Sequence, residues 1–187
     1  MQRDKIFKEQ ILSNFLHDKE FQQGLEMALS PFTTFGVAKI PISKKDGFGL
    51  GFEQFSEDLA KKLISRKVTG NKARELIQEH MEYAIKDEWN NWYRRILRKD
   101  LRCGVSVKTV NNVAKKSDLD FQIAVFGCML AQDAKKHLKK LVGKCLVEYK
   151  FDGVRVITLV HDGKVTMYSR NGKVLENFPH ILKAIDK

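Results

Sequence analysis

Cysteine, proline and long apolar runs are all scarce in this chain of 187 residues. The three cysteines, Cys103, Cys128 and Cys145, show no Cys-x-x-Cys spacing, so the sequence indicates neither a disulfide framework nor a zinc site. No apolar run is long enough to span a bilayer, and none follows the charged N-terminus as in a secretory signal. We therefore expect a protein of a reducing cytoplasm with no membrane association.

Acidic residues are too few to balance the basic ones, since 34 Lys and Arg face 23 Asp and Glu and the net charge is +11. The net charge is −2 over residues 1–60, +7 over residues 61–120 and +6 over residues 121–187. A polyanionic partner explains this basic excess economically. A basic protein without such a partner fits the charge about as well.

The first two thirds of the chain has a helical pattern. Apolar residues recur at helical spacing over residues 4–29, and Pro31 ends that region. The glycines of residues 46–51 favour a turn over a nucleotide-binding loop. Ser56 is predicted as the N-cap of the next helix. Helices are expected at residues 57–65, 72–86, 87–98 and 107–114.

Aromatic side chains in the 87–98 helix could pack in the protein core or stack on nucleic-acid bases. Trp89, Trp92 and Tyr93 lie at helical spacing, so we assign them to the core in preference to base stacking.

The pattern changes to β near Phe126. Residues 145–150 alternate, residues 154–160 are rich in β-branched side chains, and Asp162-Gly163 marks a hairpin turn before a returning strand at 165–169. The expected fold class is α+β, with an all-α region followed by the opening strands of a second domain.

One short stretch combines an acid, an amine and two guanidiniums. Glu148 and Lys150 would face the same side of a strand, just before the Asp152-Gly153 turn, with Arg155 and Arg170 on the following strands. Arginine suits phosphate oxygens, and lysine attacks once burial or positive charge lowers its pKa. Taken alone, the geometry is more typical of a surface lysine beside a hairpin.

The motif Lys150-x-Asp152-Gly153-x-Arg155 resembles the signature of covalent nucleotidyltransferases, which include DNA ligases, RNA ligases and mRNA capping enzymes. The segments Met129-Leu130-Ala131 and Ser169-Arg170-Asn171-Gly172 resemble the flanking motifs of ATP-dependent DNA ligases. Residues 66–71 (Arg-Lys-Val-Thr-Gly-Asn) and 98–106 resemble the helical DNA-binding domain of phage and bacterial ligases, T-even phage enzymes above all. This upstream resemblance disfavours capping enzymes and NAD-dependent ligases.

The resemblance implies a domain organisation. Residues 1–126 would form a helical DNA-binding domain, and residues 127–187 the first part of a nucleotidyltransferase (ATP-grasp-like) adenylation domain. A bacterial or phage-infected cell would be the setting.

The resemblance also implies a mechanism. Lys150 would attack the α-phosphate of ATP to form lysyl-AMP, AMP would pass to the 5′-phosphate of a nick, and the 3′-hydroxyl would then displace AMP. Glu148 matches the adenine-contacting position, Arg155 the ribose or nick position, and Arg170 a position near the phosphates. Mg²⁺ is the expected metal, and it would pair with the phosphates of ATP. No residue of this chain is predicted as a metal ligand.

Nicked double-stranded DNA is the expected partner, bound by a monomer through phosphate contacts that carry no sequence preference. Recruitment by a sliding clamp stays open. The candidate DNA contacts, each of which could equally be a solvated surface charge, are Arg66, Lys67, Asn71, Lys72, Arg102 and Lys108.

The sequence departs from the family pattern after Arg170, because no carboxylate motif for metal, no Lys-containing phosphate motif and no OB-fold follow. We therefore expect these 187 residues alone to form little lysyl-AMP and to seal no nicks. The alternatives are a non-catalytic basic DNA-binding module and an RNA ligase.

Overall fold

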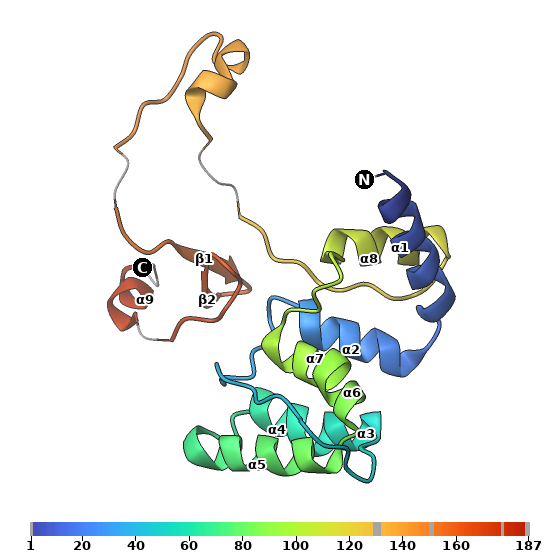
Figure 1. The fold of residues 1–187 in the computed structure, drawn as a ribbon. Coiled ribbons are helices and arrows are strands. Elements are labelled where there is room, and N and C mark those ends of the chain that lie inside the picture. Colours follow the sequence, from blue (N-terminus) through green and yellow to red (C-terminus); the bar gives the residue numbers. More distant parts are fainter. Residues whose placement is uncertain (1, 129–131, 150–151, 177, 186–187) are drawn as a thin grey trace. The chain divides into compact units, whose positions relative to one another are not determined.

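The chain divides into two compact units, residues 1–125 and residues 126–187. The computed structural model describes residues 2–128, 132–149, 152–176 and 178–185. The first unit is helical and the second contains a short β-hairpin (Figure 1). This confirms the α+β class expected from the sequence.

The first helical stretch is interrupted by a turn. Helix α1 (Gln2–Phe15) ends before Leu16, and α2 (Lys19–Leu29) begins after Asp18. The Asp18 carboxylate accepts the backbone N–H of Glu20 at 2.8 Å and that of Phe21 at 3.1 Å. An aspartate that caps a new helix in this way satisfies its first N–H groups. The prediction of one helix over residues 4–29 was therefore wrong at this turn.

Two continuous helices in the first unit each contain a π-helical segment. The first consists of α3 (Phe52–Gln54), η1 (Phe55–Ala60) and α4 (Lys61–Ile64), and the second of α6 (Lys86–Glu88), η2 (Trp89–Tyr93) and α7 (Arg94–Arg98). Ser56 is not an N-cap, because the helix already begins at Phe52. It is 2% exposed and its hydroxyl accepts a hydrogen bond from the Gln23 amide at 2.8 Å.

The main core lies between these two helices and α5 (Gly70–Tyr83). Phe55, Leu59, Ile77 and Trp89 are all buried within it. Trp89 is fully buried and Tyr93 nearly so, which confirms the core assignment for these two residues, whereas Trp92 is half-buried at the edge of this core. The indole N–H of Trp89 donates to the backbone carbonyl of Pro41 at 3.0 Å.

A second core joins α1 to α8 (Val107–Lys116) through Leu12, Leu16, Val110 and Val113. Ser106 caps α8 by accepting the N–H of Thr109. The Asn111 side chain pairs with both the N–H and the carbonyl of Ile123, at 3.0 and 2.9 Å. This amide clamp holds the segment after α8 against the helix.

The second unit is built around one hairpin. Strand β1 (Val156–His161) pairs antiparallel with β2 (Lys164–Ser169) across Asp162 and Gly163. Both turn residues have positive φ, +49° and +71°, as a two-residue type I′ turn requires, so the predicted turn is confirmed. The short 3₁₀ turns η3 (Ala134–Lys136) and η4 (Leu138–Lys140) precede the hairpin, and α9 (Pro179–Ile185) follows it.

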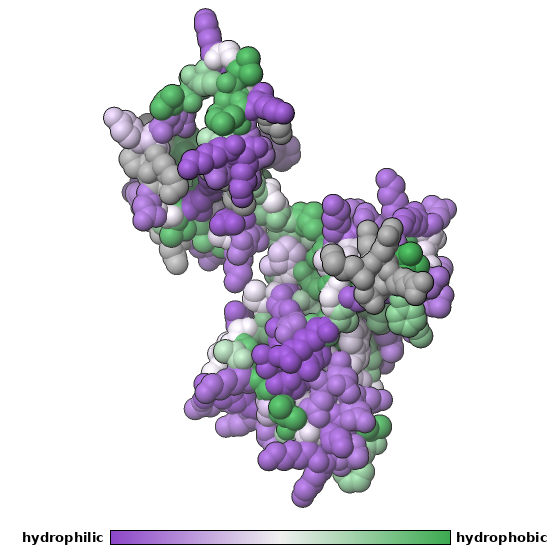
Figure 2. All heavy atoms as spheres, turned by 45° about the horizontal axis from the view of Figure 1, so that its top comes forward, coloured by the Kyte–Doolittle hydropathy of each residue, from purple (hydrophilic) through white to green (hydrophobic). Residues whose placement is uncertain are grey.

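The strand expected at residues 145–150 does not form in its described part, 145–149. A strand requires a hydrogen-bonding partner, and no described segment pairs with residues 145–149. Leu146 and Val147 are 94% and 95% exposed. Hydrophobic residues are visible among hydrophilic ones on the surfaces of both units (Figure 2). Among the described helices, none is long and apolar enough to cross a bilayer.

Candidate nucleotide site and nucleic-acid interface

The predicted nucleophile Lys150 lies outside the described residues, as do Phe151 and the segment 129–131. Glu148, the predicted adenine contact, is exposed in the stretch without regular secondary structure before Lys150. Asp152 and Gly153 are also exposed. Across the described ranges, no group of three His, Cys, Asp or Glu side chains could hold a metal ion.

Arg155 and Arg170 lie at the same end of the hairpin. Val156 pairs with Ser169, so Arg155 precedes β1 where Arg170 follows β2. The Arg155 guanidinium donates to the Cys128 sulfur at 3.7 Å, and the Cys128 thiol faces the Arg170 carbonyl at 4.0 Å. The structure therefore brings the Arg155 guanidinium and the Arg170 backbone together around Cys128. Nothing in the spacing of Cys128 signalled this contact.

A tight loop holds Arg170 at that end. The N–H of Gly172 donates to the Ser169 carbonyl at 2.9 Å, and the N–H of Ser169 donates to the Lys173 carbonyl at 2.7 Å. Gly172 is buried with φ +80°, a conformation that favours glycine. The loop thus fixes the backbone beside Arg170 and leaves its side chain exposed.

The first basic loop joins α4 to α5. Arg66 has φ +60° and its N–H donates to the Leu63 carbonyl, so it ends the preceding helix in a left-handed conformation. Its guanidinium lies against Gly36, where an added Cβ would collide with it. The other candidate residues of this loop are all exposed: Lys67, Asn71 and Lys72.

The second basic loop joins α7 to α8. Arg102 has φ +50° and its guanidinium pairs with Asp100 at 3.3 Å. Lys108 is exposed in the first turn of α8. Lys99 turns inward, and its ammonium donates to the carbonyls of Met27 and Ser30 at the end of α2.

The segment 36–40 lies between the first basic loop and helix α7. Arg66 lies against its first residue, and the buried Arg94 donates from Nε to the carbonyl of its last residue, Ile40, at 3.1 Å. Lys39 is exposed between these contacts. Four residues span no more than about 14 Å, so Arg66 and Arg94 flank one short segment, and we call the two loops, this segment and α7 together the basic surface.

Electrostatic coupling links Arg94 of α7 to Arg102 of the second basic loop. Burial lowers the pKa of Arg94, and the neighbouring charges of Arg98, Arg95 and Arg102 lower it further. Arg95, Arg98 and Lys39 were missed as candidates from the sequence. Arg95 and Arg98 sit within a helix whose aromatic residues are its main sequence signal, and Lys39 sits in an irregular segment without periodicity.

Residues 128–187 match the family model described as the ATP dependent DNA ligase domain, so this part of the chain is related to ATP-dependent DNA ligases. A DNA ligase from Ignicoccus hospitalis aligns over 60 residues with 45% identity. The alignment covers 29% of this chain and 10% of that ligase. Two solved structures, titled Pmar-Lig_PreS3 and Pmar-Lig_Pre, match at 46% and 47% identity with TM-scores of 0.85 and 0.83.

Each solved structure is matched over 97% of this chain, and the chain spans 42% of its length. The likeness therefore extends over both units, while much of each relative lies outside the matched region. These relatives give no support for the narrower resemblance to T-even phage ligases.

Proposed function

We propose that this chain provides the DNA-binding unit, residues 1–125, and the lysine nucleophile of an ATP-dependent DNA ligase. The activity would seal 5′-phosphate/3′-hydroxyl nicks in duplex DNA through lysyl-AMP on Lys150. The observation that carries the proposal is the ligase-domain match of residues 128–187, which contains the Lys150 motif. The placement of Arg155 and Arg170 at one end of the hairpin supports it.

In the proposed first step, the Lys150 amine forms a bond to the α-phosphorus of ATP and pyrophosphate leaves. The amine must be unprotonated, and nearby guanidiniums favour the neutral form because they repel an ammonium. Arg155 and Arg170 fit phosphate oxygens because a guanidinium donates two parallel hydrogen bonds. We expect Mg²⁺ to pair with the substrate phosphates, since it is seldom held by a dedicated all-protein cage.

In the proposed DNA complex, the basic surface of the helical unit contacts phosphates of the duplex. The contributing side chains come from the two loops and the helix ends beside them, from α7 and from segment 36–40, and they are Lys39, Arg66, Lys67, Asn71, Lys72, Arg95, Arg98, Arg102 and Lys108. Phosphate contacts set affinity without reading sequence, which suits an enzyme that seals nicks anywhere.

The test of the nucleotide step uses a polypeptide that extends these residues to the length of the solved relatives. We expect α-labelled ATP to label that polypeptide covalently, and Lys150→Ala to abolish both labelling and nick sealing. Lys144→Ala, a lysine six residues earlier, should keep both activities. Full nick sealing by the Lys150→Ala variant would refute the proposal, and preference for nicked RNA would favour an RNA ligase.

The 187-residue chain tests the DNA interface separately. The triple variant Lys39→Gln, Arg98→Gln and Arg102→Gln should weaken binding to a nicked duplex and flatten its salt dependence. The slope of log affinity against log salt should fall by about 0.9 for each DNA phosphate that the variant no longer neutralises. The control removes three positive charges elsewhere, at Lys19, Lys61 and Lys115. Equally weakened binding in both triple variants would show that net charge alone, and not this surface, binds DNA.

A further inference from the structure

The helical unit contains a hollow of about 410 Å³ that the proposed function does not use. Five aromatic side chains line it, from α1, α2, α3 and η2: Phe15, Phe21, Phe52, Trp92 and Tyr93. Tyr93 and Phe52 are buried, Trp92 and Phe21 are half-buried, and Phe15 is 57% exposed. We name this cavity the aromatic hollow. Half of the residues that line it are therefore aromatic.

The charged side chains of the aromatic hollow are all acidic, although the chain as a whole carries a net charge of +11. They are Asp18, Glu20 and Glu88, each exposed. Burial raises the pKa of Tyr93 to about 12, and the charges of Glu88 and Glu20 contribute to the rise. The negative field therefore reaches the buried ring of Tyr93.

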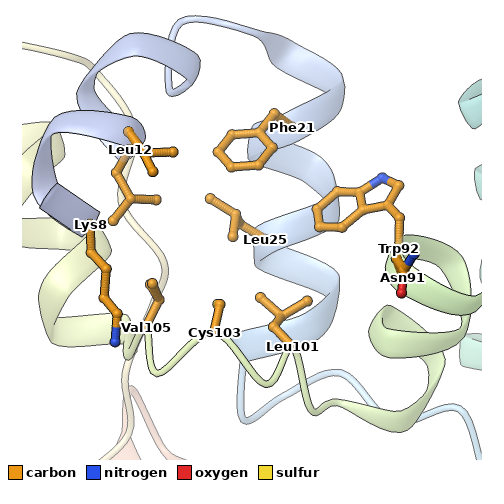
Figure 3. Close-up of a pocket in the computed structure, with 10 residues that line it drawn as sticks. Lys8, Leu12, Phe21, Leu25, Asn91, Trp92, Leu101, Cys103 and Val105 are labelled. Carbon is orange, nitrogen blue, oxygen red and sulfur yellow. The ribbon is translucent and has the colours of Figure 1, made fainter. Parts of the chain in front are cut away.

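A second hollow of about 270 Å³ adjoins the first. Phe21 and Trp92 line both cavities, and their rings stack with centroids 5.8 Å apart. Figure 3 shows these two rings next to each other, Phe21 on α2 and Trp92 on the helix that carries Asn91. Apart from Lys8 and Asn91, the second hollow is lined by apolar side chains and the Cys103 thiol. We name it the apolar hollow.

Aromatic faces surrounded by carboxylates are the environment that an organic cation prefers in water. The ring quadrupole attracts the cation, and the carboxylates add a direct charge interaction. An apolar cavity beside such a site favours an aliphatic group next to the cation. The single charged lining residue of the apolar hollow is Lys8, which disfavours a cation there and leaves the aromatic hollow as the place for one.

We propose that the aromatic hollow binds an arginine or lysine side chain of a peptide segment from another protein, whose neighbouring aliphatic side chain fills the apolar hollow. This interaction uses neither the nucleotide site nor the basic surface. It therefore stands or fails independently of the ligase proposal.

The acidic charge of the aromatic hollow disfavours two other candidate occupants, DNA and a second copy of this chain. DNA phosphates would meet three carboxylates. A second copy of this chain, bound about a two-fold axis at this site, would bring its own acidic cluster close to the first, and the two clusters would repel each other. A basic peptide instead brings a charge opposite to that of Asp18, Glu20 and Glu88.

The test titrates the 187-residue chain with the peptide acetyl-Gly-Leu-Arg-Gly-amide and follows tryptophan fluorescence. Trp92 is half-buried at the site, whereas Trp89 is fully buried, so Trp92 should report the binding. We expect a saturable change in emission. The matched peptide with glutamine in place of arginine should bind about tenfold more weakly.

The double variant Glu20→Gln and Glu88→Gln should weaken the arginine peptide by about tenfold and leave the glutamine peptide unchanged. The control variant Glu75→Gln and Glu79→Gln changes the same charge on α5, outside the aromatic hollow, and should bind normally. Circular dichroism checks that each variant is folded, and Phe15→Ala at the exposed wall should also weaken binding.

Equal affinity for the two peptides would overturn the proposal, as would unchanged binding by the double variant or the absence of saturation. Concentration-dependent dimerisation that the double variant strengthens would assign the hollow to a second copy instead. Tighter DNA binding in the double variant, without any loss of peptide binding, would also contradict the assignment.

Discussion

At the scale of single residues, three side chains of the helix 86–98 hold an irregular segment in place. Trp89 donates to the carbonyl of Pro41, Arg94 to that of Ile40, and the Tyr93 hydroxyl to that of Leu50 at 2.6 Å. Buried carbonyls of irregular chain need such donors, because they have no regular backbone partner. These bonds position a segment that contributes to the basic surface at Lys39 and to the aromatic hollow at Leu50.

Replacement of Tyr93 by phenylalanine should reveal its contribution as a function of pH. The variant loses one hydrogen bond to a buried carbonyl, which should cost about 1 kcal/mol at neutral pH. Because the folded-state pKa of about 12 exceeds the ordinary value of 10.0, the neutral hydroxyl stabilises the fold fully below pH 10, and this stabilisation is lost as pH rises to 12. The loss at pH 11 should be about 1.4 kcal/mol.

Urea unfolding of the wild type and of Tyr93→Phe at pH 8 and pH 11 measures this effect. The difference between the two proteins cancels the titration of the other tyrosines and of the lysines. A wild-type advantage that stays constant or grows between these pH values would contradict the assigned pKa of Tyr93.

At the scale of elements, the C-terminal end of α2 depends on a residue far along the chain. The Lys99 ammonium donates to the carbonyls of Met27 at 3.2 Å and Ser30 at 2.6 Å. A cation at a helix C-terminus satisfies carbonyls that have no partner within the helix and opposes the helix dipole. Lys99 adopts φ +54° in doing so, which places it at the end of α7 as well.

Replacement of Lys99 by methionine should therefore destabilise the helical unit by about 2 kcal/mol, the usual effect of losing hydrogen bonds from a charged donor. Hydrogen exchange in the last turn of α2 should accelerate along with the loss of stability in urea. Lys115→Met, at an exposed position of α8, should change stability by no more than about 0.5 kcal/mol. Indistinguishable unfolding of the two variants would show that the Lys99 hydrogen bonds contribute nothing.

The sequence predicted the existence of most elements better than their boundaries. Helical periodicity located the helices near 72–86, 87–98 and 107–114, and Asp162-Gly163 located the hairpin, because each signal is local. The break before Asp18 was missed because apolar spacing continues across it. Residues 145–149 were misassigned because alternation predicts a strand only where a partner strand is available.

The candidate sites also differ in whether their sequence signal is local or depends on tertiary contacts. The motif around Lys150 and the two arginines of the hairpin could be found from spacing. The basic surface could be found only in part, since Lys39 joins it through tertiary contacts of Arg66 and Arg94 with segment 36–40. The aromatic hollow gave no sequence signal, because four separate elements provide its walls.

At the scale of the whole molecule, the two units differ in how much apolar surface they bury. Apart from Met167, every buried hydrophobic side chain among the described residues belongs to the first unit. Both core clusters also lie within that unit. A unit with its own core is expected to fold independently.

A truncated chain of residues 1–125 should therefore unfold at the same temperature as the 187-residue chain, within about 2 °C. Differential scanning calorimetry of both chains measures this directly. A large drop in the melting temperature of the truncated chain would mean that the second unit stabilises the helical one, contrary to the distribution of buried residues.

The unequal cores also have a consequence for synthesis on the ribosome. The helical unit emerges first and contains every partner that its two cores require, so it can fold while later residues are still being added. Val147, Tyr149 and Val154 are at least 81% exposed and emerge before β1 and β2. We expect chaperones that recognise nascent chains to engage this stretch in preference to the helical unit.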